Sequence, residues 1–402
     1  MSEKADCINW VEVDAPSEVV LPYDGLARPP EDVESTKILL EKLVVLKLNG
    51  DHGQNMGCIG PKASIEVHNG LTFLDLIVIQ IEIQCPPIIT EDPVSGEGNS
   101  RKDVCHPLDQ GDIFTSLNNS GYLDVSLAEG KEYVFIADSD NVGAIIDIIS
   151  LSSTEILNHV ISNQNEYCIE VTPKTPTDVI GSALISYEGR VQVHYLFDVQ
   201  LEQLTQPFLF LLSFCLSMQV NDVKEVEKFK LLTTNNLWVN LKAIKRLIEV
   251  ELLKMEITPK SKEIYGVKVQ QLESPAGIAI HNFNKAIGIN VLCSRFCPVK
   301  TTSDLLLVQS DLYTLNDGSL IRNPARVKPS DPLIELGPEF KEVTNFLDRF
   351  RSIPSVIELD KLEVSGDVWF GSDIKLKGEV TITAKFGVKS KLPDGLVLEN
   401  KV

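Results

Sequence analysis

Apolar and polar positions follow two different patterns in the two parts of this chain. Up to about residue 345, continuous apolar runs predict strands buried on both faces of a parallel sheet, as in residues 44–48 (VVLKL) and 133–137 (YVFIA). Longer apolar or amphipathic stretches between such runs predict helices. The predicted helices fall within residues 35–43, 71–84, 139–151, 235–256 and 301–315, and residues 165–175 and 181–196 are strand-rich. This alternation indicates an α/β fold.

The pattern changes after residue 345. Short alternating strands separated by glycine turns fill residues 355–402, and the stretch VSGDVWFGSDIKLKGEVTIT repeats in steps of roughly six residues. Such steps are typical of a parallel β-helix. We therefore predict an irregular N-terminal arm over residues 1–35, a catalytic domain over residues 36–344 and a β-helix domain over residues 345–402.

Composition narrows the classes of partner and site. The formal net charge of -20 disfavours nucleic acids and anionic membranes as partners. The eight cysteines are scattered and offer no zinc-ligand spacing, and the six histidines form no triad or metal pattern. The first 16 residues lack the apolar core of a signal peptide, and the longest apolar run, residues 208–216, is too short to span a bilayer. A cytoplasmic protein with reduced thiols is the expectation.

Several long motifs occur in order: KLVVLKLNG, EVHNGLTFLDLIVIQIE, GKEYVFIADSDNVGA, NEYCIEVTPKT, TNNLWVNLKAIKRL and FCPVKTTSDLLLVQSDLYTL. Through them nearly the whole chain resembles the UDP-glucose pyrophosphorylases, also called UTP–glucose-1-phosphate uridylyltransferases, and most of all the plant enzymes. The resemblance implies a Rossmann-like (GT-A-like) nucleotidyltransferase domain followed by a shortened left-handed parallel β-helix domain. It implies reversible formation of UDP-glucose and pyrophosphate from UTP and glucose 1-phosphate, with Mg²⁺, by in-line attack on the α-phosphorus.

The resemblance also assigns the groups that would meet the nucleotide. Leu48, Asn49 and Gly50 match the start of the nucleotide loop, and Lys62 and Lys300 match two phosphate-contacting lysines. Physically, a lysine is a point charge suited to a phosphate oxygen. The alternatives are a solvated surface lysine at residue 62 and a lysine near a helix start at residue 300.

An acidic turn follows the strand YVFIA, at the edge of a sheet where α/β folds bind ligands. Asp140 matches the aspartate expected to hold Mg²⁺ and the nucleotide, because a hard cation prefers carboxylate oxygens. Asp138 and Ser139 belong to the same substrate-binding turn, although the family has asparagine where this chain has Asp138. The alternative for Asp140 is an Asx turn that caps the next helix.

Other matched segments would face glucose. Amide and carboxylate groups suit a ligand rich in hydroxyls, and the matching residues are Glu170, Thr172, Gly181, Asn235 and Asn236. The two asparagines could instead serve as turn or capping residues. Arg295, in CSRFCPVK, is a weaker candidate for an anion contact.

Five departures from the family pattern fall near the chemistry. Asp51 replaces a loop glycine that should lie against the substrate, and Asp109 and Gln110 replace a glycine near uracil and a histidine near the sugar phosphate. A strand–helix unit of several dozen residues, which includes a uracil-reading glutamine, is missing after Gln84. The apolar stretch within residues 204–220 has no family counterpart and resembles a translated intron, or else an apolar surface insertion.

These departures leave two alternatives to an active UDP-glucose pyrophosphorylase. One is a catalytically impaired paralogue that acts as a binding or oligomer-modulating subunit, and the other is a pyrophosphorylase with a changed nucleotide or sugar preference. The family also implies either a homo-oligomer or association with an intact family member.

Overall fold

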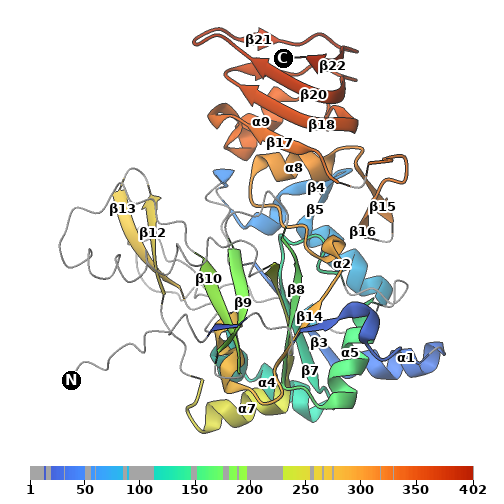
Figure 1. Ribbon diagram of the computed structural model, residues 1–402, viewed down its shortest axis with the longest axis vertical. Coiled ribbons are helices and arrows are strands. Elements are labelled where there is room, and N and C mark those ends of the chain that lie inside the picture. Colours follow the sequence, from blue (N-terminus) through green and yellow to red (C-terminus); the bar gives the residue numbers. More distant parts are fainter. Residues whose placement is uncertain are drawn as a thin grey trace.

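The computed structural model of the chain combines a mixed β-sheet, which is covered by helices, with a stack of parallel strands near its C-terminus (Figure 1). The structure describes residues 13–14, 20–30, 32–49, 56–58, 60–84, 88–89, 113–145, 152–174, 181–187, 190–196, 230–253, 258–264, 267–273, 276–316, 318–328 and 330–401. Within them no helix is long and apolar enough to cross a membrane.

The central sheet has ten strands among the described residues, and seven of them run in the order β2-β14-β8-β11-β7-β3-β6. The seven strands are β2 (Val20–Pro22), β14 (Ile287–Asn290), β8 (Tyr167–Pro173), β11 (Leu231–Asn240), β7 (Tyr133–Asp138), β3 (Leu43–Leu48) and β6 (Ile88–Ile89). The other three, β1 (Val13–Asp14), β9 (Gly181–Tyr187) and β10 (Arg190–Leu196), extend the sheet beside β11.

Four of the six pairs along the seven-strand order are parallel, and the two pairs made by β11 are antiparallel. Strand β3 pairs in parallel with β7 and β6, and β14 pairs in parallel with β8 and β2. Strand β11 lies antiparallel between β7 and β8, with a register shift between Thr233 and Leu237. Its first half therefore lies beside the carboxyl ends of its two neighbours.

Alternate residues of a strand point to opposite faces of the sheet. Both faces carry apolar side chains here, and helices cover both. Val44 and Leu46 face a core shared with α3 (Ile113–Asn119), α4 (Tyr122–Ala128) and α7 (Leu241–Glu249). Leu43 and Val45 face the opposite core, with α1 (Val33–Leu40) and α5 (Ser152–Asn163). The sheet is thus the middle of three layers, which is why its strands are apolar on both faces.

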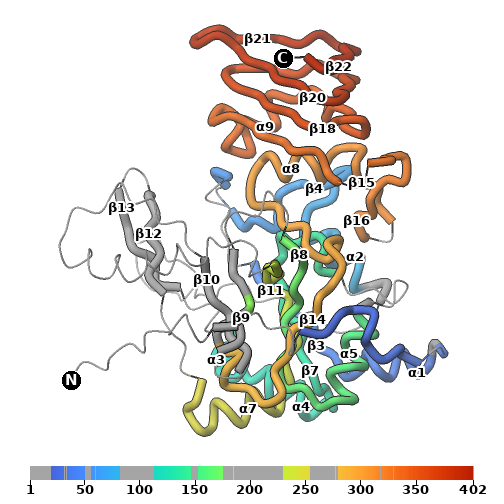
Figure 2. The backbone as a smooth tube through the Cα atoms, viewed as in Figure 1, coloured from blue at the N-terminus to red at the C-terminus, as the bar shows by residue number. Residues whose placement is uncertain are grey.

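A third core connects the sheet domain to the C-terminal strands. It includes Phe73 of α2 (Phe73–Gln84), Leu305 of α8 (Thr302–Gln309) and Phe346 of α9 (Val343–Arg349). Strands β17 (Leu333–Leu336), β18 (Ser355–Ser365), β20 (Lys375–Thr383) and β22 (Val397–Lys401) pair in parallel, as do β19 (Val368–Trp369) and β21 (Ser390–Lys391). Figure 2 shows the chain passing from α8 into this stack.

Smaller elements complete the described structure. Three two-stranded ribbons are β4 (Glu66–His68) with β5 (Leu71–Thr72), β12 (Thr258–Ile264) with β13 (Val267–Glu273), and β15 (Tyr313–Asn316) with β16 (Ser319–Arg322). The short 3₁₀ helices are η2 (Tyr23–Gly25), η4 (Lys62–Ser64), η7 (Ala276–Asn282), η8 (Cys293–Arg295) and η9 (Pro338–Phe340).

Four boundaries differ from the sequence prediction. Helix α1 is capped by Asp32, whose carboxylate accepts from the Ser35 amide, so Ser35 is inside the helix. Residues 235–240 belong to β11, because β-branched and aromatic packing overrides the helical pattern. The predicted helix 301–315 ends at Gln309 and continues into β15. Residues 139–145 form turns, and the next described helix begins at Ser152.

Candidate functional site

Polar side chains gather where the carboxyl ends of three strands meet. Strand β3 ends at Leu48, β7 ends at Asp138 and β8 ends at Pro173, and the register shift in β11 lies beside the last two. The amide of Ser139 donates to the carbonyl oxygen of Leu48 at 2.8 Å. This edge is where an open α/β sheet leaves a crevice for a ligand.

The two predicted phosphate lysines converge on the predicted metal ligand. Lys62 Nζ donates to Asp140 Oδ2 at 2.6 Å, and Lys300 Nζ donates to the same oxygen at 2.8 Å. The Lys62 side chain is 2% exposed and that of Asp140 4%, whereas Lys300 is 50% exposed. Two lysines that lie 78 and 160 positions from Asp140 in the sequence therefore form one charged cluster with it.

Asp140 also has an oxygen suited to a cation. Its Oδ1 is buried and has no hydrogen-bond partner in the structure. Among the described residues there is no group of three or more His, Cys, Asp or Glu side chains that could hold a metal. One buried carboxylate oxygen fits Mg²⁺ bound together with a substrate, because Mg²⁺ usually takes one or two carboxylates and fills its shell with phosphate oxygens and waters.

Asn49 and Ser139 join the ends of β3 and β7 to the Lys62 segment. Asn49 Oδ1 accepts from the Ala63 amide at 3.2 Å and from Ser139 Oγ at 3.4 Å. Asn49 thus fastens the start of η4, where Lys62 lies just after Pro61, to the end of β3. Gly50, the third residue predicted for this loop, lies outside the described residues, as do Asp51, Asp109, Gln110 and residues 204–220.

Asn235 lies at the β11 irregularity, with a φ of 59°. Asparagine tolerates this left-handed conformation better than most residues. Its side chain hydrogen-bonds to Asp138. Burial raises the pKa of Asp138 to about 6; Lys300 opposes this increase and the Asp140 carboxylate adds to it. Asn235 and Asp138 are therefore paired beside the lysine cluster.

Glu170 and Asn236, two of the residues predicted to face the sugar, lie in a buried hydrogen-bond network. Both side chains are fully buried. Glu170 Oε1 accepts from Trp238 Nε1 at 2.9 Å, and Glu170 Oε2 accepts from Asn236 Nδ2 at 3.0 Å. A sugar hydroxyl could reach Glu170 only by displacing one of these partners, so the geometry favours a structural position below the site.

Arg295 completes this buried layer. It was a weaker candidate for an anion contact, yet its side chain is 6% exposed and forms a two-pronged ion pair with Glu170. The Nε–Oε2 distance is 2.8 Å and the Nη2–Oε1 distance is 2.6 Å. Sequence reasoning placed Glu170 and Arg295 near one site but could not pair them, because they are 125 positions apart.

The remaining sugar-facing candidates are close to the same edge. Thr172 is buried near the end of β8, and its Oγ1 donates to Cys293 Sγ at 3.4 Å. Gly181 is the first residue of β9, whose Ala183 pairs with Leu232 of β11. The roles of Thr172, Gly181, Asn235 and Asn236 toward a sugar stay predictions.

Lys47 is a buried lysine that the sequence analysis did not single out. It lies in β3, donates to the carbonyl oxygen of Ala144 and is 8% exposed. Burial lowers its pKa to about 7, Arg295 adds to this effect, and Asp138 opposes it. The sequence signal that could have identified Lys47 is its position inside the apolar run VVLKL.

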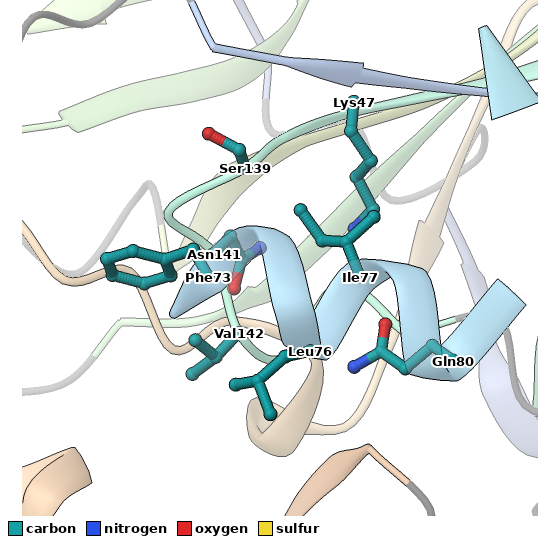
Figure 3. Close-up of a pocket in the computed structure, with 8 residues that line it drawn as sticks. All are labelled: Lys47, Phe73, Leu76, Ile77, Gln80, Ser139, Asn141 and Val142. Carbon is teal, nitrogen blue, oxygen red and sulfur yellow. The ribbon is translucent and has the colours of Figure 1, made fainter. Parts of the chain in front are cut away.

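Lys47 lines a small cavity between α2 and the turn after β7 (Figure 3). Ser139 and Asn141 come from that turn, and Phe73, Leu76, Ile77 and Gln80 come from α2. The volume of about 10 Å³ suits a single water molecule. This cavity is too small for a nucleotide.

Comparison with known proteins gives a consistent family. The profile of the family described as UTP–glucose-1-phosphate uridylyltransferase matches residues 1–94 and 83–377. The enzyme of that name from Hordeum vulgare is 56% identical over 447 aligned positions, which cover 100% of this chain and 90% of the relative. The Saccharomyces cerevisiae enzyme is 39% identical, over 98% of this chain and 84% of the relative.

Solved structures agree in fold. A UDP-glucose phosphorylase from Trypanosoma brucei matches with a TM-score of 0.74 and 26% identity, covering 95% of this chain and 92% of that one. A Leishmania major UDP-glucose pyrophosphorylase mutant, solved in complex with UDP-glucose, matches with a TM-score of 0.76 and 24% identity, covering 97% of this chain and 90% of that one.

The alignment also bears on the missing unit. It runs over 447 positions although the chain has 402 residues, so at least 45 positions of the barley enzyme have no counterpart here. The two profile matches meet at residues 83–94, next to Gln84, where the sequence analysis places the loss. The resemblance itself is confirmed: this chain belongs to the UTP–glucose-1-phosphate uridylyltransferase family.

Proposed function

We propose that this chain transfers the uridylyl group of UTP to glucose 1-phosphate, forming UDP-glucose and pyrophosphate in a reversible reaction. The convergence of Lys62 and Lys300 on Asp140 carries the proposal, because it gathers two positive charges at the sheet edge of a strongly acidic protein. An anionic substrate needs such a local reversal of charge.

The reaction needs alignment and charge neutralisation more than covalent catalysis. A phosphate oxygen of glucose 1-phosphate forms a bond to the α-phosphorus of UTP, and the bond from that phosphorus to the oxygen that links it to the β-phosphorus breaks. The leaving pyrophosphate takes the electron pair. Lys62 and Lys300 would stabilise the charge that develops on the phosphate oxygens.

Mg²⁺ is the divalent cation that we propose for this site. When bound, it neutralises and orients the phosphates. Asp140 would hold it through the buried Oδ1, which has no hydrogen-bond partner. Ser139, Asp138 and Asn49 would line the same edge, and Asn235 would be the amide closest to the incoming sugar phosphate.

Four finer features belong to the same proposal. We infer a division into an arm (residues 1–35), a catalytic domain (36–344) and a C-terminal domain (345–402). The parallel strands β17, β18, β20 and β22 fit coils of a left-handed β-helix. We also propose a cytoplasmic location and a homo-oligomer or association with an intact family member, as the family resemblance implies.

UDP-glucose formation by the purified chain, from UTP, glucose 1-phosphate and Mg²⁺, tests the function. Turnover that falls by about 100-fold or more in Lys300→Ala is the expected result, because charge stabilisation in the transition state is lost. Lys300 is half exposed, so its replacement leaves the core intact. A folded protein without turnover, together with binding to an intact family member, would instead favour a non-catalytic subunit. Turnover with another nucleoside triphosphate, but not with UTP, would favour changed specificity.

A further inference from the structure

Side chains of the central sheet hydrogen-bond to the buried ion pair of Glu170 and Arg295. Trp238 Nε1 and Asn236 Nδ2 each donate to one oxygen of the Glu170 carboxylate. The Trp238 ring lies against Phe135 of β7, with 4.5 Å between ring centroids. Two-pronged guanidinium–carboxylate contacts fix orientation as well as distance. The sheet therefore determines where the Arg295 side chain lies.

Arg295 in turn holds both ends of the acidic turn after β7. Its Nη1 donates to the carbonyl oxygen of Ile145 at 3.0 Å and to Ser153 Oγ at 3.1 Å. Its own carbonyl oxygen accepts from Asn141 Nδ2 at 3.2 Å. One residue thus joins the segment that precedes Lys300 to the turn that carries Asp140.

The next residues of the Lys300 segment run along the same turn. The Cys297 amide donates to Asn141 Oδ1 at 2.8 Å, and the Val299 amide donates to the carbonyl oxygen of Asp140 at 3.0 Å. Gly143 permits this approach, since a Cβ there would lie 2.8 Å from the carbonyl carbon of Arg295. The path from Arg295 to Lys300 is therefore hydrogen-bonded to this turn at every second residue, at Arg295, Cys297 and Val299.

We propose that Glu170 and Arg295 are positioning residues whose ion pair places Lys300 against Asp140 for phosphate binding. The proposal rests on the proposed function for the identity of the anion. Neither side chain is exposed enough to touch a substrate, so both act through Lys300. Without the pair, Lys300 would remain attached to Asp140 only through main-chain contacts and its own flexible side chain.

The chain supplies a matched control at the other end of the same strand. Arg246 Nη1 and Nη2 contact Glu166 Oε1 and Oε2 at 2.6 and 2.7 Å, next to the start of β8 and away from the lysine cluster. Arg295→Lys keeps the positive charge but loses the contact through two guanidinium nitrogens. Arg246→Lys makes the same change in the control pair. We expect Arg295→Lys to lower kcat/KM by about 10- to 100-fold, and Arg246→Lys to change it less than about twofold.

A double-mutant cycle separates positioning from plain structural damage. In a Lys300→Ala background, Arg295→Lys should cost less than about threefold, because the residue through which it acts is gone. An equal loss in both backgrounds would overturn the proposal. Thermal unfolding establishes that each variant is folded, and Glu170→Asp is the second variant. If neither Arg295→Lys nor Glu170→Asp folds, the pair serves stability and the proposal is wrong.

Calorimetric binding of inorganic pyrophosphate gives a readout that does not need turnover. Arg295→Lys should weaken pyrophosphate binding in the otherwise wild-type chain. In the Lys300→Ala background, it should leave this binding unchanged. If the wild-type chain binds pyrophosphate but makes no UDP-glucose, the proposed function fails while this cycle still tests the positioning. If the wild type turns over and Arg295→Lys matches it in both assays, the positioning fails alone.

Discussion

Lys62 Nζ lies 2.6 Å from Asp140 Oδ2, and both side chains are almost completely buried. A buried ammonium requires a nearby negative charge because desolvation strongly disfavours it. The same oxygen accepts from Lys300. A phosphate oxygen that binds both lysines, as we propose, would therefore compete with this carboxylate.

Asp140→Asn should increase the affinity for metal-free pyrophosphate. The anion no longer has to displace a competing carboxylate, so we expect Kd in the presence of a chelator to fall at least tenfold, or about 1.4 kcal/mol. Addition of Mg²⁺ should tighten binding to the wild type but not to the variant. Isothermal calorimetry measures both. Asp124→Asn, which breaks the exposed pair with Lys245, is the control; unchanged pyrophosphate affinity in Asp140→Asn would contradict the prediction.

Replacement of the two lysines should affect activity and stability differently. Lys62→Ala removes a buried partner of Asp140 and should destabilise the fold by about 3 kcal/mol. Lys300→Ala removes a half-exposed partner and should cost less than about 1 kcal/mol. Each should lower kcat by about 100-fold or more, because charge stabilisation in the transition state is lost. Equal shifts in the midpoint of thermal unfolding would show that burial does not distinguish the two lysines.

The sequence was informative where local pattern and long motifs agree. The apolar runs at β3 and β7 predicted buried strands, and the motif order predicted the family. Residues 235–240 were predicted as helix because their pattern is ambiguous, and only packing between β7 and β8 makes them a strand.

Side-chain partners could not be predicted in the same way. Asp140, Lys62 and Lys300 were expected in one site, but the shared Oδ2 atom depends on three distant segments. The buried partners of Glu170, which are Arg295, Trp238 and Asn236, could not be predicted from the sequence either. The domain boundaries and the sugar contacts stay predictions.

Lys47 predicts a specific pH dependence of stability. Its folded-state pKa of about 7 is below the ordinary lysine value of 10.5, so between these pH values the unfolded chain binds more protons and stability rises with pH. Lys47→Met removes this contribution, which at most approaches about 1.4 kcal/mol per pH unit. The stability of the wild type minus that of Lys47→Met should therefore increase from pH 7 to pH 9, as measured by denaturant unfolding. Lys42→Met, at an exposed pair with Glu132, should show no such slope.

Asp51→Gly should improve the use of UTP. The family resemblance places residue 51 against the triphosphate, and a carboxylate about 4 Å from a phosphate charge repels it by up to roughly 4 kcal/mol near a protein surface. We expect KM for UTP to fall at least about tenfold, because Mg²⁺ screens part of this repulsion. KM for glucose 1-phosphate is the internal control and should change little, since the sugar phosphate binds on the other side of the α-phosphorus. Equal changes in both KM values would mean that Asp51 acts on the loop's conformation, and no change in either would place its carboxylate away from the phosphates.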